Sequence, residues 1–360
     1  MKKNSSVLFI IFCLVIFATQ VCLAAPSDTS NLPKIKILAT GGTIAGAAAS
    51  ATQTVGYKAA VFPVDDLINN VPQLKTIANV SGEQISQIGS QDMNDAVWLK
   101  LAHRVNELLA SDDVDGIVIT HGTDTLEETA YFLNLVVKSD KPVVLVGAMR
   151  PATAISADGP INLYNAVLIA GNSQAKGKGV MVSMNDTILG ARDVEKQNTF
   201  MVDTFKAPDT GALGYVQSGN VCFYKESLRK HTVKSEFDVT GLNELPRVDI
   251  FYGYANASRD YIDQAVKLGV KGIVNAGVGD GSLYADVEKA LIDAQKSGVL
   301  VVRSSRTGSG LVARNGESND DKNGFIASDN LTSQKARILL KLALTKTNDV
   351  QEIQRMFSEY

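Results

Sequence analysis

The sequence predicts an α/β protein, with a larger N-terminal domain on a mostly parallel, helix-flanked β-sheet and a smaller C-terminal parallel α/β domain. Three observations support this prediction. Short runs of β-branched and other apolar residues alternate with segments of helical periodicity. Such alternation is typical of parallel sheets with helices on both faces. A polar stretch separates two such series, and 360 residues fit two domains of roughly 150 residues each.

The first series contains four expected strands separated by helices. These strands are Ile35–Thr40, Gly116–Thr120, Pro142–Gly147 and Gly179–Met184. An apolar stripe over residues 97–108 predicts a helix that Asn94 or Asp95 can cap. A second helix covers residues 130–137. A third follows Pro160, because proline suits the first turn of a helix.

The second series predicts the C-terminal domain, residues 247–360. Residues 225–246 have few apolar and many charged side chains, and we interpret them as a linker after the domain formed by residues 33–224. The expected strands beyond the linker are Val248–Tyr252, Gly272–Val278 and Leu300–Arg303. The expected helices are Ala285–Lys296, Ser333–Thr345 and Val350–Phe357.

The first 24 residues, 1–24, have the pattern of a cleavable signal peptide. Lys2 and Lys3 precede an apolar run over residues 7–18. Small residues then precede the expected cleavage point after Ala24. A membrane anchor is the alternative, but the apolar run is shorter than the ~20 residues that a spanning helix needs. We therefore expect export to the periplasm, or secretion, without membrane attachment of the mature chain.

Charge and cysteine content argue against several classes of function. The formal net charge of −3 becomes −5 when Lys2 and Lys3 leave with the signal peptide. An acidic chain without basic patches is not expected to bind nucleic acid. Cys222 is the one cysteine of the mature chain, so we expect no intramolecular disulfide, and its apolar neighbours predict a core position. The histidines are widely spaced, and we expect no metal site and no cofactor.

Two segments rich in glycine and threonine carry the functional prediction. Residues 37–46 are Ile-Leu-Ala-Thr-Gly-Gly-Thr-Ile-Ala-Gly, and residues 117–125 are Ile-Val-Ile-Thr-His-Gly-Thr-Asp-Thr. Each begins as an expected strand and becomes polar where the strand should end, which is where open α/β sheets bind ligands. Both lack the glycine pattern of dinucleotide and phosphate loops, which weakens the alternative of a dehydrogenase. Thr43 and Thr123, beside glycines that allow close approach, favour acyl-transfer chemistry.

The second segment also predicts the start of a helix. Thr125 and Glu128 have the spacing of a capping box, in which the threonine side chain accepts a backbone hydrogen bond. The N-terminal end of that helix would then face Thr123 and Asp124 and could stabilise an oxyanion or a carboxylate. Without a catalytic role, Thr43 would be an ordinary turn threonine and Asp124 a second capping residue.

Further polar residues are weak candidates when each is considered alone. Lys196 could act as a base in a cleft, although most lysines are solvated. Tyr57 ends a stretch, residues 52–57, that could close over a site and exclude water. Ser90 and Gln91 offer neutral hydrogen-bonding groups to a small zwitterion.

Together these segments resemble the bacterial type II L-asparaginases and glutaminase-asparaginases. The similarity runs from Ile35 to Tyr360. It includes further blocks in the same order, namely Gly89–Met93, Gly147–Pro151, Ser156–Gly159, Met184–Asp186 and Arg303–Arg306. The resemblance implies a homotetrameric amidohydrolase that converts L-asparagine to L-aspartate and ammonia at sites between two subunits.

The resemblance also implies catalytic roles. Thr43 corresponds to the nucleophile, Tyr57 to the loop tyrosine paired with it, and Glu317 to a glutamate that orients this tyrosine from a neighbouring subunit. A second catalytic group corresponds to Thr123, Asp124 and Lys196. The substrate's α-carboxylate and α-ammonium groups would be held by Ser90, Gln91 and Asp124. The carbonyl of Ala148 corresponds to a contact with the scissile amide.

The chain departs from parts of this family at two positions. Ser139 occupies a position where some members have a disulfide cysteine. Ser282 occupies a substrate-binding position where some asparagine-selective members have asparagine, and serine is found there in members with glutaminase activity. A dual-specificity glutaminase-asparaginase, acting also on L-glutamine, therefore stays open. An exported amino-acid-binding protein without turnover is a further alternative.

Overall fold

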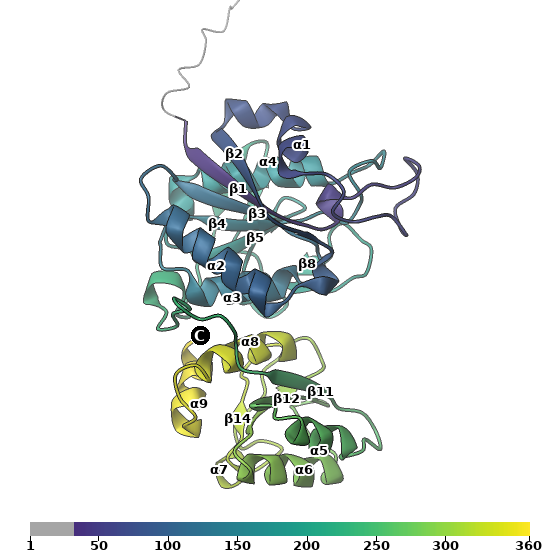
Figure 1. The fold of residues 1–360 in the computed structure, drawn as a ribbon, viewed down its shortest axis with the longest axis vertical. Helices are drawn as coiled ribbons and strands as arrows, with labels where there is room; N and C mark the ends of the chain where they lie inside the picture. Colours follow the sequence, from purple (N-terminus) through teal and green to yellow (C-terminus); the bar gives the residue numbers. More distant parts are fainter. Residues whose placement is uncertain (1–31) are drawn as a thin grey trace, which may run out of the picture. The chain divides into compact units, whose positions relative to one another are not determined.

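The computed structural model describes residues 32–360. The expected signal peptide and the polar segment up to Asn31 lie outside these described residues. Within residues 32–360, no helix is long and apolar enough to cross a membrane. The fold class is confirmed, with a larger N-terminal domain on an eight-stranded sheet and a smaller C-terminal domain on a four-stranded sheet (Figure 1).

The eight-stranded sheet has the strand order β10-β9-β6-β5-β4-β3-β1-β2. Its parallel strands are β1 (Lys34–Gly41), β2 (Asn79–Ile88), β3 (Gly116–Thr120), β4 (Val143–Val146) and β5 (Val180–Met184). Three antiparallel strands extend it, β6 (Thr187–Gly190), β9 (Gly214–Gln217) and β10 (Asn220–Phe223). The four predicted strands form its centre, because continuous apolar runs suit strands that are buried on both faces.

The two edges of this sheet were not predicted. β2 mixes polar and apolar residues and is half-exposed, so its sequence resembles that of a loop. β10 lies at the other edge and carries Cys222. The prediction of a core position for Cys222 is wrong, because an edge strand leaves this side chain only half-buried.

Helices cover both faces of the large sheet. α2 (Asp95–Leu109) and α3 (Leu126–Val136) pack on one face, and α1 (Val64–Asn69) and α4 (Gly159–Ala170) on the other. Two predicted helix starts are confirmed. Asn94 caps α2 by accepting a hydrogen bond from the N–H of Val97, and Pro160 lies in the first turn of α4.

The C-terminal sheet contains four parallel strands, β11 (Val248–Tyr252), β12 (Gly272–Gly277), β13 (Leu300–Ser305) and β14 (Ile326–Ala327). Two helices, α5 (Asp260–Lys267) and α6 (Ala285–Lys296), enclose a separate core on one face. The remaining elements of this domain are α7 (Asp320–Asn323), α8 (Ser333–Ala343) and α9 (Val350–Glu359). β14, α5 and α7 are short and were not predicted.

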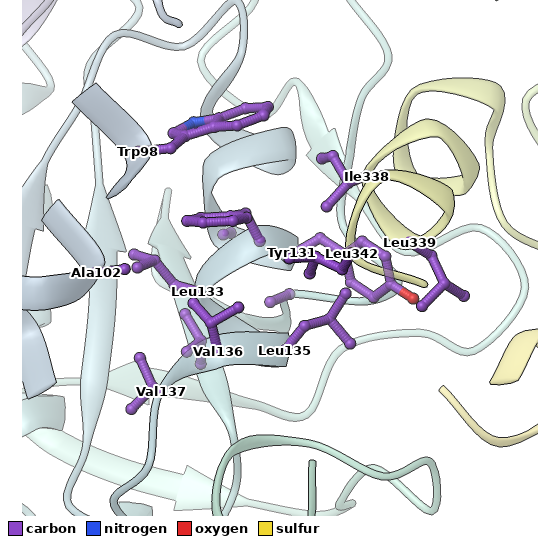
Figure 2. Packing of buried hydrophobic residues seen from close by; sticks show 14 of the residues in the cluster. Trp98, Ala102, Tyr131, Leu133, Leu135, Val136, Val137, Ile338, Leu339 and Leu342 are labelled. Atoms are coloured by element: carbon purple, nitrogen blue, oxygen red, sulfur yellow. The ribbon is translucent and has the colours of Figure 1, made fainter. Parts of the chain in front are cut away.

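Helix α8 joins the two domains. It packs on the C-terminal sheet and against α3, so that one hydrophobic core extends across both domains. Figure 2 shows Leu339 and Leu342 of α8 beside Tyr131 of α3. The C-terminal domain therefore lies in direct contact with the helix that follows the second glycine- and threonine-rich segment.

Candidate active site

The two glycine- and threonine-rich segments meet at one edge of the large sheet. β1 and β3 are parallel neighbours, so Thr43 and Thr123 follow strand ends on the same side. Gly42 has a φ of +84°, and a Cβ added there would lie 2.3 Å from the Cα of Gly122. A Cβ on Gly122 would lie 2.6 Å from Ser90 Oγ. Glycine is therefore required at both positions, and backbone packs directly against backbone beneath the site.

Thr43 has one close hydroxyl partner. Its Oγ1 lies 2.7 Å from the hydroxyl of Tyr57, and the two share a hydrogen bond. Thr43 is buried and Tyr57 is half-buried. Burial raises the pKa of Tyr57, and the nearby carboxylates of Asp124 and Asp158 add to this, against a lowering by the bond to Thr43. The phenol is therefore protonated at neutral pH.

Thr123 has a lysine partner. Lys196 Nζ lies 2.9 Å from Thr123 Oγ1 and 2.6 Å from Asp124 Oδ1. The lysine side chain is only 17% exposed, so the alternative of a solvated surface lysine is wrong. A hydroxyl, an amine and a carboxylate thus form a continuous path along which a proton can move.

Both groups line one cavity of about 400 Å³. Its walls include seven of the predicted site residues, namely Thr43, Tyr57, Ser90, Gln91, Thr123, Asp124 and Lys196. Ala148 is fully buried and does not line the cavity, although its neighbour Met149 does. Within residues 32–360, no group of three or more His, Cys, Asp and Glu side chains could hold a metal ion.

Helix α3 begins where the sequence predicted, but the expected capping box is wrong. The Oγ1 of Thr125 donates to the carbonyl of Ser90 at 2.7 Å and makes no capping bond to the helix. Ser90 Oγ in turn accepts a hydrogen bond from the N–H of Asp124 at 3.1 Å. Thr125 thus connects the Ser90 segment to the start of α3. Glu128 does not complete a capping box, and its Oε2 lies 3.9 Å from Nη1 of Arg337.

A buried hydrogen-bond chain supports the second segment. His121 is fully buried, with Nδ1 2.7 Å from the carbonyl of Gly122 and Nε2 2.8 Å from Thr129 Oγ1. Trp98 Nε1 donates to the same hydroxyl at 2.8 Å. The carbonyl can only accept, so Nδ1 carries the proton and Nε2 accepts from Thr129. Burial lowers the pKa of His121 to about 4, which keeps the ring neutral at pH 7.

The two C-terminal candidates do not line this cavity within the same chain. Ser282 lines a separate cavity of about 310 Å³ beyond the end of β12. Glu317 is exposed on the segment that precedes α7. Neither residue therefore contributes to the Thr43 cavity within this chain.

A buried ion pair fixes the two loops that carry these candidates. Arg303 and Asp320 are fully buried, with Nε–Oδ1 and Nη2–Oδ2 distances of 2.6 and 2.8 Å. The guanidinium also donates to the carbonyls of Asp280, Gly281 and Ala313. One side chain thus ties the Ser282 loop to the Glu317 loop.

Several wall residues were not predicted. Met149, Thr199 and Phe200 line the cavity beside Lys196. Phe200 is 66% exposed despite its large apolar side chain. An aromatic residue soon after a candidate lysine is a weak signal, and the sequence contains no motif that would have singled it out.

Comparisons with known proteins agree with this geometry. Residues 34–229 match the family described as "Asparaginase, N-terminal", and residues 247–357 match "Glutaminase/Asparaginase C-terminal domain". The chain is 58% identical over 341 residues to L-asparaginase 2 of Bacillus subtilis, covering 95% of this chain and 90% of that protein. It is 49% identical over 348 residues to a glutaminase-asparaginase of Pseudomonas fluorescens, covering 96% of each. The crystal structure of a probable cytoplasmic L-asparaginase from Campylobacter jejuni matches with a TM-score of 0.89 and 52% identity, over 91% of this chain and 100% of that one.

The chain has a two-domain α/β fold, and its cavity is lined by two threonine hydroxyls, a phenol and a lysine. The family matches cover both domains. The chain belongs to the asparaginase family.

Proposed function

We propose that this protein hydrolyses the side-chain amide of L-asparagine to give L-aspartate and ammonia. The observation that carries the proposal is the presence of two reactive groups in one cavity: Thr43 with Tyr57, and Thr123 with Lys196 and Asp124. Membership of the asparaginase family supports the same reaction.

The proposed nucleophile is the Thr43 hydroxyl. Its oxygen attacks the amide carbon while its proton leaves through the Tyr57 hydroxyl, 2.7 Å away. Because burial raises the pKa of Tyr57, the phenol relays this proton and does not retain a negative charge. The carbon–nitrogen bond then breaks, and the nitrogen takes the proton relayed through Tyr57 and leaves as ammonia. Water hydrolyses the ester formed on Thr43 and returns a proton to the threonine oxygen.

The proposed role of the second group is proton transfer beside the nucleophile. Lys196 can act as a base only when its amine is neutral. The 2.6 Å contact between Nζ and Asp124 Oδ1 holds the amine in place beside Thr123. Thr123 Oγ1, 2.9 Å from the same Nζ, then connects the lysine to the substrate.

Substrate recognition is proposed to involve residues at the start of α3. Ser90, Gln91 and Asp124 would hold the α-carboxylate and α-ammonium groups, and the N-terminal end of α3 favours the carboxylate. The Ala148 carbonyl would accept a hydrogen bond from the amide.

L-Glutamine is the second candidate substrate. The small Ser282 side chain favours it, because a site that is wider by one methylene tolerates the longer substrate. The similar Pseudomonas fluorescens protein is named a glutaminase-asparaginase. A binding protein without turnover is less well supported, since it would not need the contacts of Lys196 with Thr123 and Asp124.

We further propose a homotetramer in which Ser282 and Glu317 complete a neighbouring subunit's site. Their separation from the cavity within one chain supports this arrangement. Export to the periplasm through residues 1–24, and a linker at 225–246 between domains 33–224 and 247–360, are also part of the proposal.

Ammonia release from L-asparagine and L-glutamine at equal concentrations tests the function of the mature protein. Release from asparagine is expected, and the glutamine rate decides between the two specificities. Thr43→Ala should lower kcat by about 10³-fold or more while aspartate still binds. Saturable aspartate binding by the wild type without ammonia release would contradict the proposal, and wild-type turnover by folded Thr43→Ala would exclude Thr43 as the nucleophile.

A further inference from the structure

Helix α8 of the C-terminal domain contacts the segment that carries Lys196. We propose that Lys335, Gln334 and Glu127 are positioning residues that hold Lys196 beside Thr123. The inference rests on the proposed function, because it assigns these residues a role in the reaction only through Lys196.

Lys335 fixes the backbone just before Lys196. Its side chain is 1% exposed, and Nζ donates to the carbonyls of Arg192 and Val194 at 2.8 and 2.5 Å. A buried ammonium is costly unless hydrogen bonds and opposite charges compensate it. Burial lowers the pKa of Lys335, and the nearby carboxylates of Glu127, Glu195 and Asp193 oppose part of this lowering. Its two hydrogen bonds hold the turn that leads into β7 (Glu195–Lys196).

Glu127 fixes the backbone of Lys196 itself. This residue is 5% exposed and lies in the first turn of α3. Its Oε2 accepts a hydrogen bond from the Lys196 N–H at 2.6 Å, and its Oε1 accepts one from Gln334 Nε2 at 2.8 Å. One carboxylate thereby connects α3, α8 and β7.

These backbone contacts matter because the head group of Lys196 must satisfy two partners at once. Nζ reaches Thr123 at 2.9 Å and Asp124 at 2.6 Å from the end of a flexible side chain. Asp124 directly precedes Thr125, the N-cap residue of α3, and Glu127 lies in the first turn, so both partners of Lys196 are located at the same end of one helix. A displacement of about 1 Å in such a group can reduce a rate by ~10²-fold.

A second buried lysine of α8 provides a matched control. Lys341 is 3% exposed, and its Nζ contacts both carboxylate oxygens of Asp95 in α2 at 2.8 and 2.6 Å. Like Lys335, it ties α8 to the N-terminal domain. Neither Lys341 nor Asp95 lines the cavity.

The first experiment compares Lys335→Met with Lys341→Met in the full-length mature protein. Methionine keeps an unbranched apolar chain and removes the ammonium in both variants. We expect Lys335→Met to lower kcat by about 10- to 100-fold, with KM changed by less than about threefold. Lys341→Met should lower the melting temperature and leave kcat unchanged. An unchanged kcat in folded Lys335→Met, or an equal loss in both variants, would overturn the inference.

The second experiment uses Glu127→Gln and remains decisive if Lys335→Met does not fold. The new amide keeps its oxygen on the Lys196 N–H only when its nitrogen faces Gln334, and Gln334 must then turn its own amide and give up the hydrogen bond that its Oε1 accepts from Ser333. The swap Glu127→Gln with Gln334→Glu restores a donor and an acceptor at both contacts. We expect kcat to fall in the single variant and to recover in the double variant. If Glu127 and Gln334 contribute to stability alone, the melting temperature will change while kcat stays unchanged in both variants. That result would contradict the inference.

Lys196→Met separates the inference from the function on which it rests. If this variant keeps wild-type turnover, the proposed role of Lys196 itself is wrong. If it is inactive while Lys335→Met and Glu127→Gln keep wild-type kcat, only the positioning inference is wrong.

Discussion

Substitution of Arg303 by methionine should destabilise the C-terminal domain strongly. Both members of the Arg303–Asp320 pair are fully buried and joined by two short hydrogen bonds. Methionine fills part of the same space but leaves the Asp320 carboxylate buried without its cation. Removing one partner of a buried pair costs about 3–5 kcal/mol. The three backbone carbonyls that lose their donor increase this cost, so we expect the upper part of that range.

Urea unfolding of the wild type, Arg303→Met, Asp320→Asn and the double variant would measure this cost. All four need the same protein concentration, because the proposed subunit association would make apparent stability depend on concentration. The double variant should lose less free energy of unfolding than the two single variants lose together, since it contains no unpaired buried charge. A loss below about 1 kcal/mol in Arg303→Met would refute the reasoning. If the Ser282 and Glu317 loops complete a neighbour's site, the rate of hydrolysis should also fall, because both loops lose the contacts that Arg303 makes.

Three further predictions concern selectivity, assembly and pH. Ser282→Asn should favour asparagine over glutamine by about 1–3 kcal/mol, and an unchanged activity ratio would place selectivity elsewhere. Thr43→Ala and Glu317→Ala chains, refolded together, should regain activity above either parent; no recovery in verified mixed assemblies would contradict a role of Glu317 across the interface. Because the pKa of His121 falls from 6.5 to about 4 on folding, the unfolded chain binds an extra proton between these values. Stability should therefore fall by up to about 3 kcal/mol as pH drops through that window, and His121→Gln should lack this part of the slope in urea unfolding.

The centre of the fold could be predicted because its signals are local. A strand such as β3 is a continuous apolar run that ends in glycine and threonine, and both its type and its polar end follow from that pattern. The meeting of Thr43 and Thr123 follows in turn, since parallel neighbours end at the same edge. β2 could not be recognised, because an edge strand with one exposed side does not need an apolar run.

The remaining parts of the site depend on contacts between distant segments. Lys196 lies in β7, a two-residue strand paired with β8 (Phe205–Lys206), and neither has a periodic apolar pattern. Thr125 has the spacing of a cap, yet its hydroxyl bonds Ser90, which is 35 positions away. Sequence spacing cannot distinguish a helix cap from such a long-range contact. In the proposed assembly Glu317 would approach Thr43 from a second chain, and spacing within one sequence cannot predict such a contact.

The contact between Gly42 and Gly122 gives the cavity one rigid wall and one adaptable wall. A side chain at Gly42 would overlap the backbone of Gly122, and a side chain at Gly122 would overlap the side chain of Ser90. Substitutions at these two glycines therefore cannot enlarge the cavity for a longer substrate. Other lining residues, among them Val55 and Phe200, are exposed and lie outside the sheet, so their side chains can change without disturbing it. Libraries that aim to alter substrate range should vary these exposed residues and keep both glycines.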